Sequence, residues 1–448
     1  MQILIKGARV LDPGNLDGKK DILVKDGVIE AILDPSGPSD PTGPGDPIDP
    51  GHSPDVQVPG VQVPGVQIID ASNMIVVPGL IDIHVHLREP GQEYKETIES
   101  GLKAAVKGGF TAVCSMPNTI PVNDNSQVTT FIINKGKAAG AAKVYPAGAI
   151  SQGSLGTSLA EIYDMQQAGI RAATDDGLPV ENSQMMRRAL EYCKGLDMPI
   201  FVHAEDKSLV DGGSMNEGPP ATFWGIKGIP NAAESIMVLR DIALCELTGA
   251  AVHFCHMSTA ESIEAIRQAK KRGANVSCET APHYFTLTDE AVLDYDTNFK
   301  MNPPLRSEED RCAIIEGLVD GTIDMIASDH APHSVDEKEV EFDRAAFGIV
   351  GLETSLPLSL KLVQDGFLSL TDLVVKMSKQ PAKMLRIDND IKPGNPADLT
   401  IIDPEIEYKI DPDTFISKCK NTPFAGRQVQ GEAFLTMVDG RIVYQKNQ

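Results

Sequence analysis

The sequence lacks any run of 18 apolar residues, and its first ten residues, MQILIKGARV, lead directly into polar sequence. A membrane-spanning helix needs about 20 apolar residues, and a secretory signal needs an apolar core followed by a cleavage site. The sequence therefore predicts neither a membrane segment nor export. We expect a cytoplasmic protein.

Cysteine is sparse, and its pattern is not that of a paired or metal-binding set. The seven cysteines are scattered, odd in number, and form no CxxC pair. This pattern argues against a disulfide framework and against a thiolate zinc site. We expect reduced thiols, most of them in the core.

Positive charge is scarce: 40 lysines and arginines face 63 acidic residues, and the formal net charge is -23. Such a chain repels nucleic acid and anionic membranes, so we expect neither as a partner. A small acidic substrate is not excluded, because arginine, histidine and metal can make one site positive within an acidic protein. Neither GxxxxGK[ST] nor GxGxxG occurs, so a nucleotide cofactor has no support.

The chain divides by pattern into two short strand-rich ends and a long middle. Residues 1–33 alternate as short strands, whereas residues 34–66 are rich in proline and glycine and include a duplicated VQVPG. Proline removes hydrogen-bond donors, and glycine raises the entropic cost of ordering the backbone, so we expect an inserted surface loop there. With 448 residues, 42% of them apolar, the whole chain can bury a large core.

The middle of the chain alternates apolar strands with amphipathic helical stretches. Eight candidate strands begin at Met74, Thr111, Ala142, Gly169, Met198, Ala250, Asn275 and Ile323. The stretch of chain that contains these eight strands is close in length to a (β/α)8 barrel, which has about 250 residues. A doubly wound open sheet is the alternative, but polar residues recur at the carboxyl ends of nearly every strand, where barrels place active sites.

The predicted fold is therefore α/β, a TIM-type (β/α)8 barrel with a small flanking β domain. We expect the barrel to occupy residues 74–386. The short strands of residues 1–73 and 387–448 resemble each other in length and turn content, so we expect them to pair into the small domain.

The first barrel strand carries the clearest chemical signal. His84 and His86 are two residues apart, so on a strand both imidazoles face one space. Two such imidazoles can hold one cation, and Arg88 directly after them can hold an anion. The strand therefore indicates a metal and an acidic substrate.

Other strand ends add to this pair. Asp176, His203, His256 and Asp329 follow strands that would converge on the same barrel mouth. A single histidine such as His203 is more often a core residue than a ligand, but six convergent nitrogen and oxygen ligands suit two divalent cations such as zinc. Coincidence is a strained explanation of the set.

Two stretches, DIHVHLREPG at residues 82–91 and ASDHAPH at 327–333, resemble the signature motifs of dihydroorotases in the amidohydrolase superfamily. HxH alone would indicate only the superfamily. The combination of motifs over nearly the whole chain points to the long bacterial type of dihydroorotase. The further matching motifs are MPNT (116–119), TDDG (174–177), HAE (203–205), CHMST (255–259), MNPPLR (301–306), AFG (346–348) and NTPFAG (421–426).

The resemblance implies a metal set. In it His84 and His86 hold the first ion, His203 and His256 hold the second, and Asp329 lies against the first. Many superfamily members bridge the metals with a carboxylated lysine, but GIRAATDDG has none, and the resemblance favours Asp176 over Asp175. We expect one or two Zn²⁺ per subunit, with two favoured.

The resemblance also implies a reaction. A hydroxide held by metal would attack the ring carbonyl of (S)-dihydroorotate, because metal lowers the pKa of water to about 7. Asp329 would take the hydroxide's proton and deliver it to the departing ring nitrogen. The product is N-carbamoyl-L-aspartate, and ring closure is the direction of pyrimidine biosynthesis.

Substrate selection needs a cation for the carboxylate outside the ring. Arg88 offers a planar fork for it, with hydrogen bonds added by neighbouring loops, and the family reads the ring amides near AFG. The residues expected to contact substrate are His86, Arg88, Asn118, Asn302, His333, Phe347 and Gly348.

Three alternatives stay open at this point. The nearest is a sibling ring hydrolase, an allantoinase or a dihydropyrimidinase. Another is a silent homologue that serves as a scaffold for aspartate carbamoyltransferase, although such homologues usually lack the metal ligands; an active enzyme could also bind that partner. A transport or allosteric binding protein has no positive support. We expect a homo-oligomer.

Overall fold

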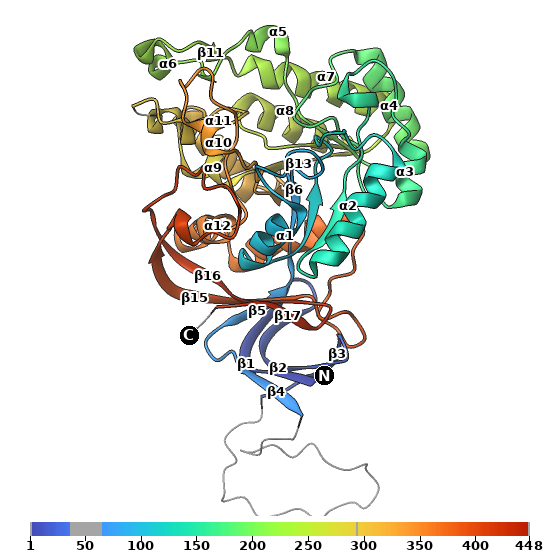
Figure 1. Ribbon diagram of the computed structural model, residues 1–448, viewed down its shortest axis with the longest axis vertical. Coiled ribbons are helices and arrows are strands. Elements are labelled where there is room, and N and C mark those ends of the chain that lie inside the picture. Colours follow the sequence, from blue (N-terminus) through green and yellow to red (C-terminus); the bar gives the residue numbers. More distant parts are fainter. Residues whose placement is uncertain (1, 36–64, 293, 447–448) are drawn as a thin grey trace, which may run out of the picture.

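The structure is a computed structural model that describes residues 2–35, 65–292 and 294–446. The loop predicted at residues 34–66 falls, between 36 and 64, outside the described residues. Figure 1 shows a large helix-covered part above a sheet that holds both ends of the chain. Within the described ranges, no helix is both long and apolar enough to cross a membrane.

The large part is a closed ring of parallel strand segments. Two parallel sheets contribute, one with the order β6-β7-β8 and one with the order β9-β12-β13-β14. Parallel bridges from Gly148 to Ala173 and from Ala173 to Ile200 join them on one side, and a bridge from Val85 to His330 joins them on the other. The predicted (β/α)8 barrel is confirmed, and an open doubly wound sheet is excluded.

The barrel strands are short and buried, as strands covered on both faces usually are. Their bounds are β6 Leu80–Val85, β7 Phe110–Ser115, β8 Lys143–Pro146, β9 Ile200–Val202, β12 Val252–Phe254, β13 Val276–Thr280 and β14 Met325–Ile326. The outer helices are α1 Ile98–Lys107, α2 Ser126–Ala139, α3 Ile162–Ala168, α4 Ser183–Gly195, α7 Ala232–Thr248, α8 Ala260–Lys271, α10 Glu308–Val319 and α12 Ser355–Gln364.

Several short helices, strands and turns lie in the loops around the barrel or at its lower end. They are α5 Lys207–Val210, β10 Met215–Asn216, α6 Pro219–Trp224, β11 Gly228–Ile229, α9 Pro282–Thr286, α11 Val335–Lys338, α13 Leu370–Val374, the π-helical turn η4 Val375–Lys379 and α14 Gln380–Leu385. The 3-10 turns are η1 Gln152–Ser154, η2 Asp289–Ala291, η3 Thr297–Phe299 and η5 Pro412–Thr414.

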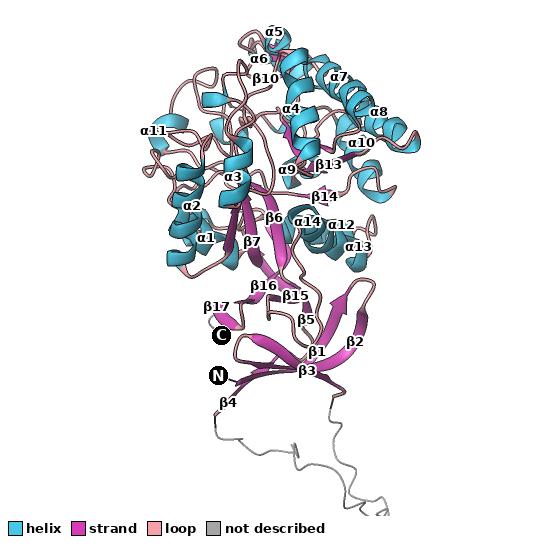
Figure 2. Cartoon of the chain, turned by 90° about the vertical axis from the view of Figure 1, so that its right-hand side faces the viewer, coloured by secondary structure: helices cyan, strands magenta, loops and turns pink. Residues whose placement is uncertain are grey.

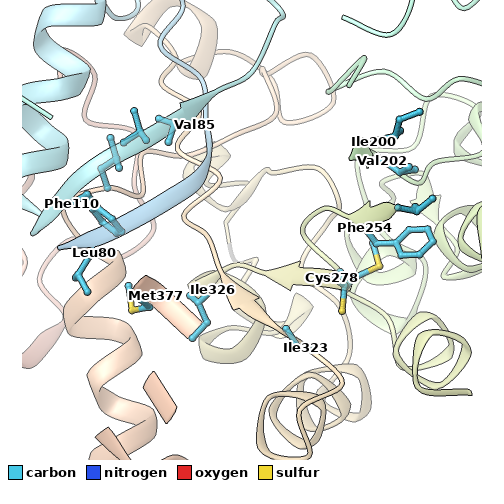
Figure 3. Packing of buried hydrophobic residues seen from close by; sticks show 14 of the residues in the cluster. Leu80, Val85, Phe110, Ile200, Val202, Phe254, Cys278, Ile323, Ile326 and Met377 are labelled. Carbon is cyan, nitrogen blue, oxygen red and sulfur yellow. The ribbon is translucent and has the colours of Figure 1, made fainter. Parts of the chain in front are cut away.

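Alternation along the strands separates two packed layers. Ile200 and Val202 of β9 point outward into the cluster between strands and helices, together with Phe254 and Cys278 of the neighbouring strands (Figure 3). Phe201, between them, belongs to a second cluster inside the ring, with small residues such as Ala112 and Ala172. Because side chains alternate along each strand, every second residue points inward, and these residues fill the barrel below the mouth at the carboxyl ends of the strands.

The two ends of the chain share one sheet, as predicted (Figure 2). Its order is β17-β16-β15-β5-β1-β2-β3, with β4 paired to β1. Antiparallel pairing of β5 with β15 joins the two halves. The bounds are β1 Gln2–Asp12, β2 Leu16–Lys25, β3 Val28–Leu33, β4 Val66–Asp70, β5 Ile75–Pro78, β15 Leu399–Lys409, β16 Gln428–Val438 and β17 Arg441–Gln445.

The apolar run from Met74 to His86 is two strands rather than the single one expected. β5 ends at Pro78 and belongs to the sheet of the chain ends, and β6 begins at Leu80 in the barrel. Gly79 lies between them, where a Cβ atom would come within 2.1 Å of Oγ1 of Thr111. The apolar pattern of residues 74–86 continues without a break, so the pattern alone does not show where one strand ends and the next begins. The close approach of Gly79 to Thr111 marks that boundary in the structure.

Candidate active site

The first histidine pair stands at the carboxyl end of β6, facing two carboxylates. Nε2 of His84 lies 3.3 Å from Oδ2 of Asp176 and 3.6 Å from Oδ1 of Asp329. Nε2 of His86 lies 3.2 Å from the same Asp329 oxygen and 3.6 Å from Oδ2 of Asp176. The structure therefore brings these four predicted residues together.

The second pair faces the other oxygen of Asp176. Oδ1 of Asp176 lies 3.4 Å from Nε2 of His256 and 3.6 Å from Nδ1 of His203, and these two nitrogens are 2.9 Å apart. Asp176 therefore stands between both histidine pairs, with one oxygen for each. Asp175 turns away and accepts hydrogen bonds from the backbone N–H groups of Ile150 and Ser151.

Several nitrogen and oxygen atoms of this cluster have no hydrogen-bond partner within the described structure. They are Nε2 of His84, Oδ1 of Asp176 and Nδ1 of His256, and all three side chains are buried. Buried polar atoms are nearly always satisfied, because an unpaired one is costly. Ligand atoms of His84, Asp176 and His256, and those of His84, His86 and Asp329, lie within 4.8 Å of one another. Both groups fit a divalent cation with nitrogen and oxygen ligands.

The aspartates are ionised in this setting. Burial favours their neutral forms, but His84, His203 and His256 outweigh it and hold the pKa of Asp176 well below its ordinary value. The pKa of Asp329 is lowered in the same way, against burial, by His86, His84 and His256. Metal ligation requires the carboxylate form, so the site supplies it at neutral pH.

Backbone strain gathers at the same place. Arg88, His256 and Asp329 have φ angles of 63°, 40° and 48°, in the left-handed region that residues other than glycine seldom occupy. Such conformations concentrate at functional sites, where the surrounding structure holds them. Asp82 provides part of this support, because its carboxylate accepts hydrogen bonds from the N–H groups of His84 and Ser328 and so ties two strand ends together.

Arg88 is a buried cation next to the cluster. Its Nε donates to the carbonyl oxygen of Pro332 at 3.1 Å, and its Nη2 lies 3.2 Å from Nε2 of His333. Burial lowers the pKa of Arg88 to about 10, which leaves it charged at neutral pH. The arrangement can bind a small carboxylate beside the metal-ligand cluster.

Two predicted substrate residues contact metal-ligand candidates directly. Oδ1 of Asn118 lies 3.0 Å from Nδ1 of His86, so the amide orients this imidazole. Nδ2 of Asn302 donates to Oε1 of Glu205 at 2.8 Å and lies 3.5 Å from Nε2 of His203. Both side chains therefore border the cluster.

Phe347 and Gly348 are positioned by lysines. The N–H of Gly348 donates to the carbonyl oxygen of Lys300 at 3.0 Å, and its own carbonyl oxygen accepts from Nζ of Lys338 and Nδ2 of Asn421. Nζ of Lys300 lies 4.3 Å above the ring of Phe347. Because both backbone groups of Gly348 are engaged within the protein, a ring amide would have to compete for them.

Two buried polar residues near the site were missed from the sequence. Oε1 of Glu279 lies 2.7 Å from Nδ1 of His84. Burial raises the pKa of Glu279, but His84 and His253 outweigh this effect and lower the pKa to about 2. His283 is buried with Nε2 unpartnered in the described structure. A charged residue within the strand sequence NVSCET is the signal that could have revealed Glu279.

Comparisons with known proteins point to dihydroorotases and to related ring hydrolases. A family model described as dihydro-orotase-like matches residues 73–262. A relative from Desulforapulum autotrophicum named dihydroorotase is 61% identical over 446 residues, and one of that name from Geobacter metallireducens is 52% identical over 448 residues; each match covers 100% of both chains. Among solved structures, an L-hydantoinase (dihydropyrimidinase) from Arthrobacter aurescens has a TM-score of 0.83 at 27% identity, covering 100% of this chain and 96% of that chain.

Proposed function

Because this chain belongs to the dihydroorotase family, we propose that it catalyses the reversible hydrolysis of the cyclic amide of (S)-dihydroorotate to N-carbamoyl-L-aspartate. The observation that carries the proposal is Asp176 standing between two histidine pairs, with the buried cation of Arg88 beside them. Ring closure is the biosynthetic direction, towards pyrimidines.

We propose Zn²⁺ as the cofactor, one or two ions per subunit with two favoured. The residues that would hold it are His84, His86, Asp176, His203, His256 and Asp329. When bound, the cation supplies a water of lowered pKa and polarises a carbonyl. The six side chains suit this because they combine imidazoles with carboxylates in a buried, closely spaced set.

Asp329 is the proposed proton carrier. Its Oδ1 faces Nε2 of both His84 and His86, so the carboxylate would be within reach of a water held by a cation at these ligands. A carboxylate there can accept a proton in one step and return it in the next. Asp329 is thus both a proposed ligand and the proposed catalytic acid and base.

Arg88 is the feature that favours dihydroorotate over a hydantoin or dihydropyrimidine ring. Those rings lack the exocyclic carboxylate, whereas a buried guanidinium is suited to bind one. His86, Asn118, Asn302, His333, Phe347 and Gly348 complete the proposed substrate contacts. The sibling activity remains the second candidate because a solved L-hydantoinase shares the fold over the full chain.

The test pairs substrate assays with metal analysis. We expect the purified protein to contain zinc and to hydrolyse dihydroorotate far faster than hydantoin or dihydrouracil. Asp329→Asn should lower kcat by at least about 100-fold, the scale of lost acid and base catalysis. Asp324→Asn, at the opposite end of β14, should leave kcat within about twofold. Preference for a ring without a carboxylate, or near-unchanged turnover of Asp329→Asn, would overturn the assignment.

We further propose that the enzyme works in the cytoplasm as a homo-oligomer. Light scattering of the purified protein measures its subunit number. Copurification with aspartate carbamoyltransferase tests whether the two enzymes associate; the sequence motifs leave that partner open.

A further inference from the structure

A line of polar side chains runs through the buried interior of the barrel. Oγ of Ser277 lies 2.8 Å from Nδ1 of His253, and Nε2 of His253 lies 3.2 Å from Oε2 of Glu279. The other oxygen of Glu279 lies 2.7 Å from Nδ1 of His84. The line therefore runs from one end of the barrel to a metal-ligand candidate at the other.

The two ends of this line lie in different surroundings. Ser277 borders a cavity of about 550 Å³ at the amino ends of the strands, which residues such as Pro199, Asn275 and Met325 also line. His84 lies at the carboxyl end of β6. The middle residues, His253 and Glu279, are 0% and 1% exposed. A carboxylate so deeply buried is destabilising unless its partners are closely placed.

Hydrogen-bond chemistry fixes the direction of each contact. The ionised Glu279 can only accept, so Nδ1 of His84 carries the proton that it receives. In the neutral imidazole that would bind a cation, the lone pair of His84 then lies on Nε2, the atom that faces Asp176 and Asp329. On the other side Nε2–H of His253 donates to Glu279, and Nδ1 accepts from the hydroxyl of Ser277. Every group of the line is satisfied by this single arrangement.

The other three histidines have weaker support in the described structure. Nδ1 of His86 meets the neutral amide of Asn118, and Nδ1 of His256 has no partner. Nε2 of His203 faces the carboxylate of Glu205 at 3.6 Å, a longer contact than the 2.7 Å between Glu279 and His84. His84 is also the histidine shared by all three groups of closely spaced ligand atoms, one of which joins it to Cys255 and to Glu279 itself. A carboxylate behind this one imidazole therefore acts on the ligand common to the groups that contain Asp176 and Asp329.

We propose that Glu279, held in place by His253, is a positioning residue that fixes the tautomer and orientation of His84 and strengthens metal binding at its Nε2. This inference rests on the proposed function only in requiring that the cluster binds a divalent cation. Outer carboxylates of this kind raise the basicity of a ligating imidazole, and their removal typically lowers metal affinity 10–100-fold.

The test measures metal affinity directly, with Zn²⁺ alone and a competing chelator. Glu279→Gln keeps the shape and an acceptor oxygen but loses the charge, so we expect zinc affinity to fall by about 10–100-fold. His253→Gln, which removes a support of Glu279, should cause a smaller loss. With Co²⁺ in place of zinc, the visible spectrum of both variants should shift, since the imidazole ligand field changes. At saturating zinc, KM should stay near that of the wild type.

Asp241→Asn is the matched control, because Asp241 is a fully buried carboxylate on α7 paired with Arg240 rather than with a ligand. Its zinc affinity should equal that of the wild type. Wild-type affinity and cobalt spectrum in Glu279→Gln would overturn the inference, and if that variant does not fold, the same result in His253→Gln would do so. A wild-type protein that binds no metal would instead overturn the proposed function.

Discussion

Nη2 of Arg88 lies 3.2 Å from Nε2 of His333, so a donor that cannot lose its proton meets an imidazole nitrogen that must accept. The proton of neutral His333 is then on Nδ1, which faces the carboxylate of Glu337 at 3.4 Å and also lies 3.4 Å from Nζ of Lys95. Arg88 also donates to the carbonyl oxygen of Pro332. The guanidinium is therefore held by two acceptors from the loop that follows Asp329, and its orientation is set before substrate binds.

Replacing Arg88 by lysine should weaken substrate binding although the charge stays. A lysine ammonium cannot span Pro332, His333 and a substrate carboxylate as the planar fork can. We expect KM for dihydroorotate to rise about 10–100-fold, equivalent to about 1.4–2.8 kcal/mol, with a smaller change in kcat. Steady-state kinetics measure this. Arg344→Lys, on the surface, is the control, and an unchanged KM in Arg88→Lys would remove Arg88 from the carboxylate site.

His333 should stay neutral throughout the physiological range. Burial first, and then Arg88 and Lys95, lower the pKa of His333 to about 3. The unfolded chain, with an ordinary pKa of about 6.5, binds more protons between these values, so stability from this group is complete above about pH 6.5 and is lost as the pH falls towards 3.

Thermal unfolding of wild type and His333→Gln from pH 8 to pH 4.5 tests this pH dependence. The difference in Tm between the two proteins should be constant above pH 6.5 and should narrow by roughly 2–4 °C on acidification. Only the wild type has an imidazole that takes up a proton on unfolding, so only the wild type loses this stability in acid. Metal loss in acid affects both proteins alike. A gap that widens as the pH falls would show that His333 is charged in the folded protein.

The neighbouring aspartates Asp175 and Asp176 offer a matched pair for the metal site. Asp176→Asn removes the charge between the histidine pairs and should reduce zinc retained after dialysis by at least half. Asp175→Asn changes the neighbouring buried carboxylate, which accepts a hydrogen bond from the N–H of Ser151, so it should lower Tm but keep the zinc. Metal content per folded monomer decides, and equal zinc in both variants would contradict a bridging position for Asp176.

Lys338 should be needed for order near Gly348. Its Nζ donates to the carbonyl oxygens of Lys300, Ala346 and Gly348 at 3.2, 2.9 and 3.1 Å. Lys338→Met would leave these acceptors without their donor, at a loss of about 1–3 kcal/mol in unfolding free energy, and should raise KM.

Hydrogen exchange over residues 334–348 and thermal unfolding measure the effect of Lys338→Met. Lys361→Met is the control, because its surface pair with Asp365 is 60% exposed on the lysine side and contributes little. Exchange in Lys338→Met at the wild-type rate would show that the three hydrogen bonds do not order this segment.

Local pattern carried much of the prediction. The alternation of apolar strands and helical stretches predicted the barrel, and the resemblance of the short strands at the two ends predicted their common sheet; both are observed. The division of residues 74–86 was missed because Pro78 and Gly79 interrupt an apolar run that looks continuous. Glu279 was missed because its partner His84 is 195 positions away, and no local pattern joins them.

By itself the sequence determined the fold class and the set of polar residues at the strand ends, because period and spacing are properties of a few consecutive residues. Only the tertiary structure decided how these residues meet: that each oxygen of Asp176 faces a different histidine pair, that Gly348 has both backbone groups engaged, and that a buried carboxylate stands behind His84. Those relationships join atoms from distant strands, and their geometry depends on the closure and packing of the whole barrel.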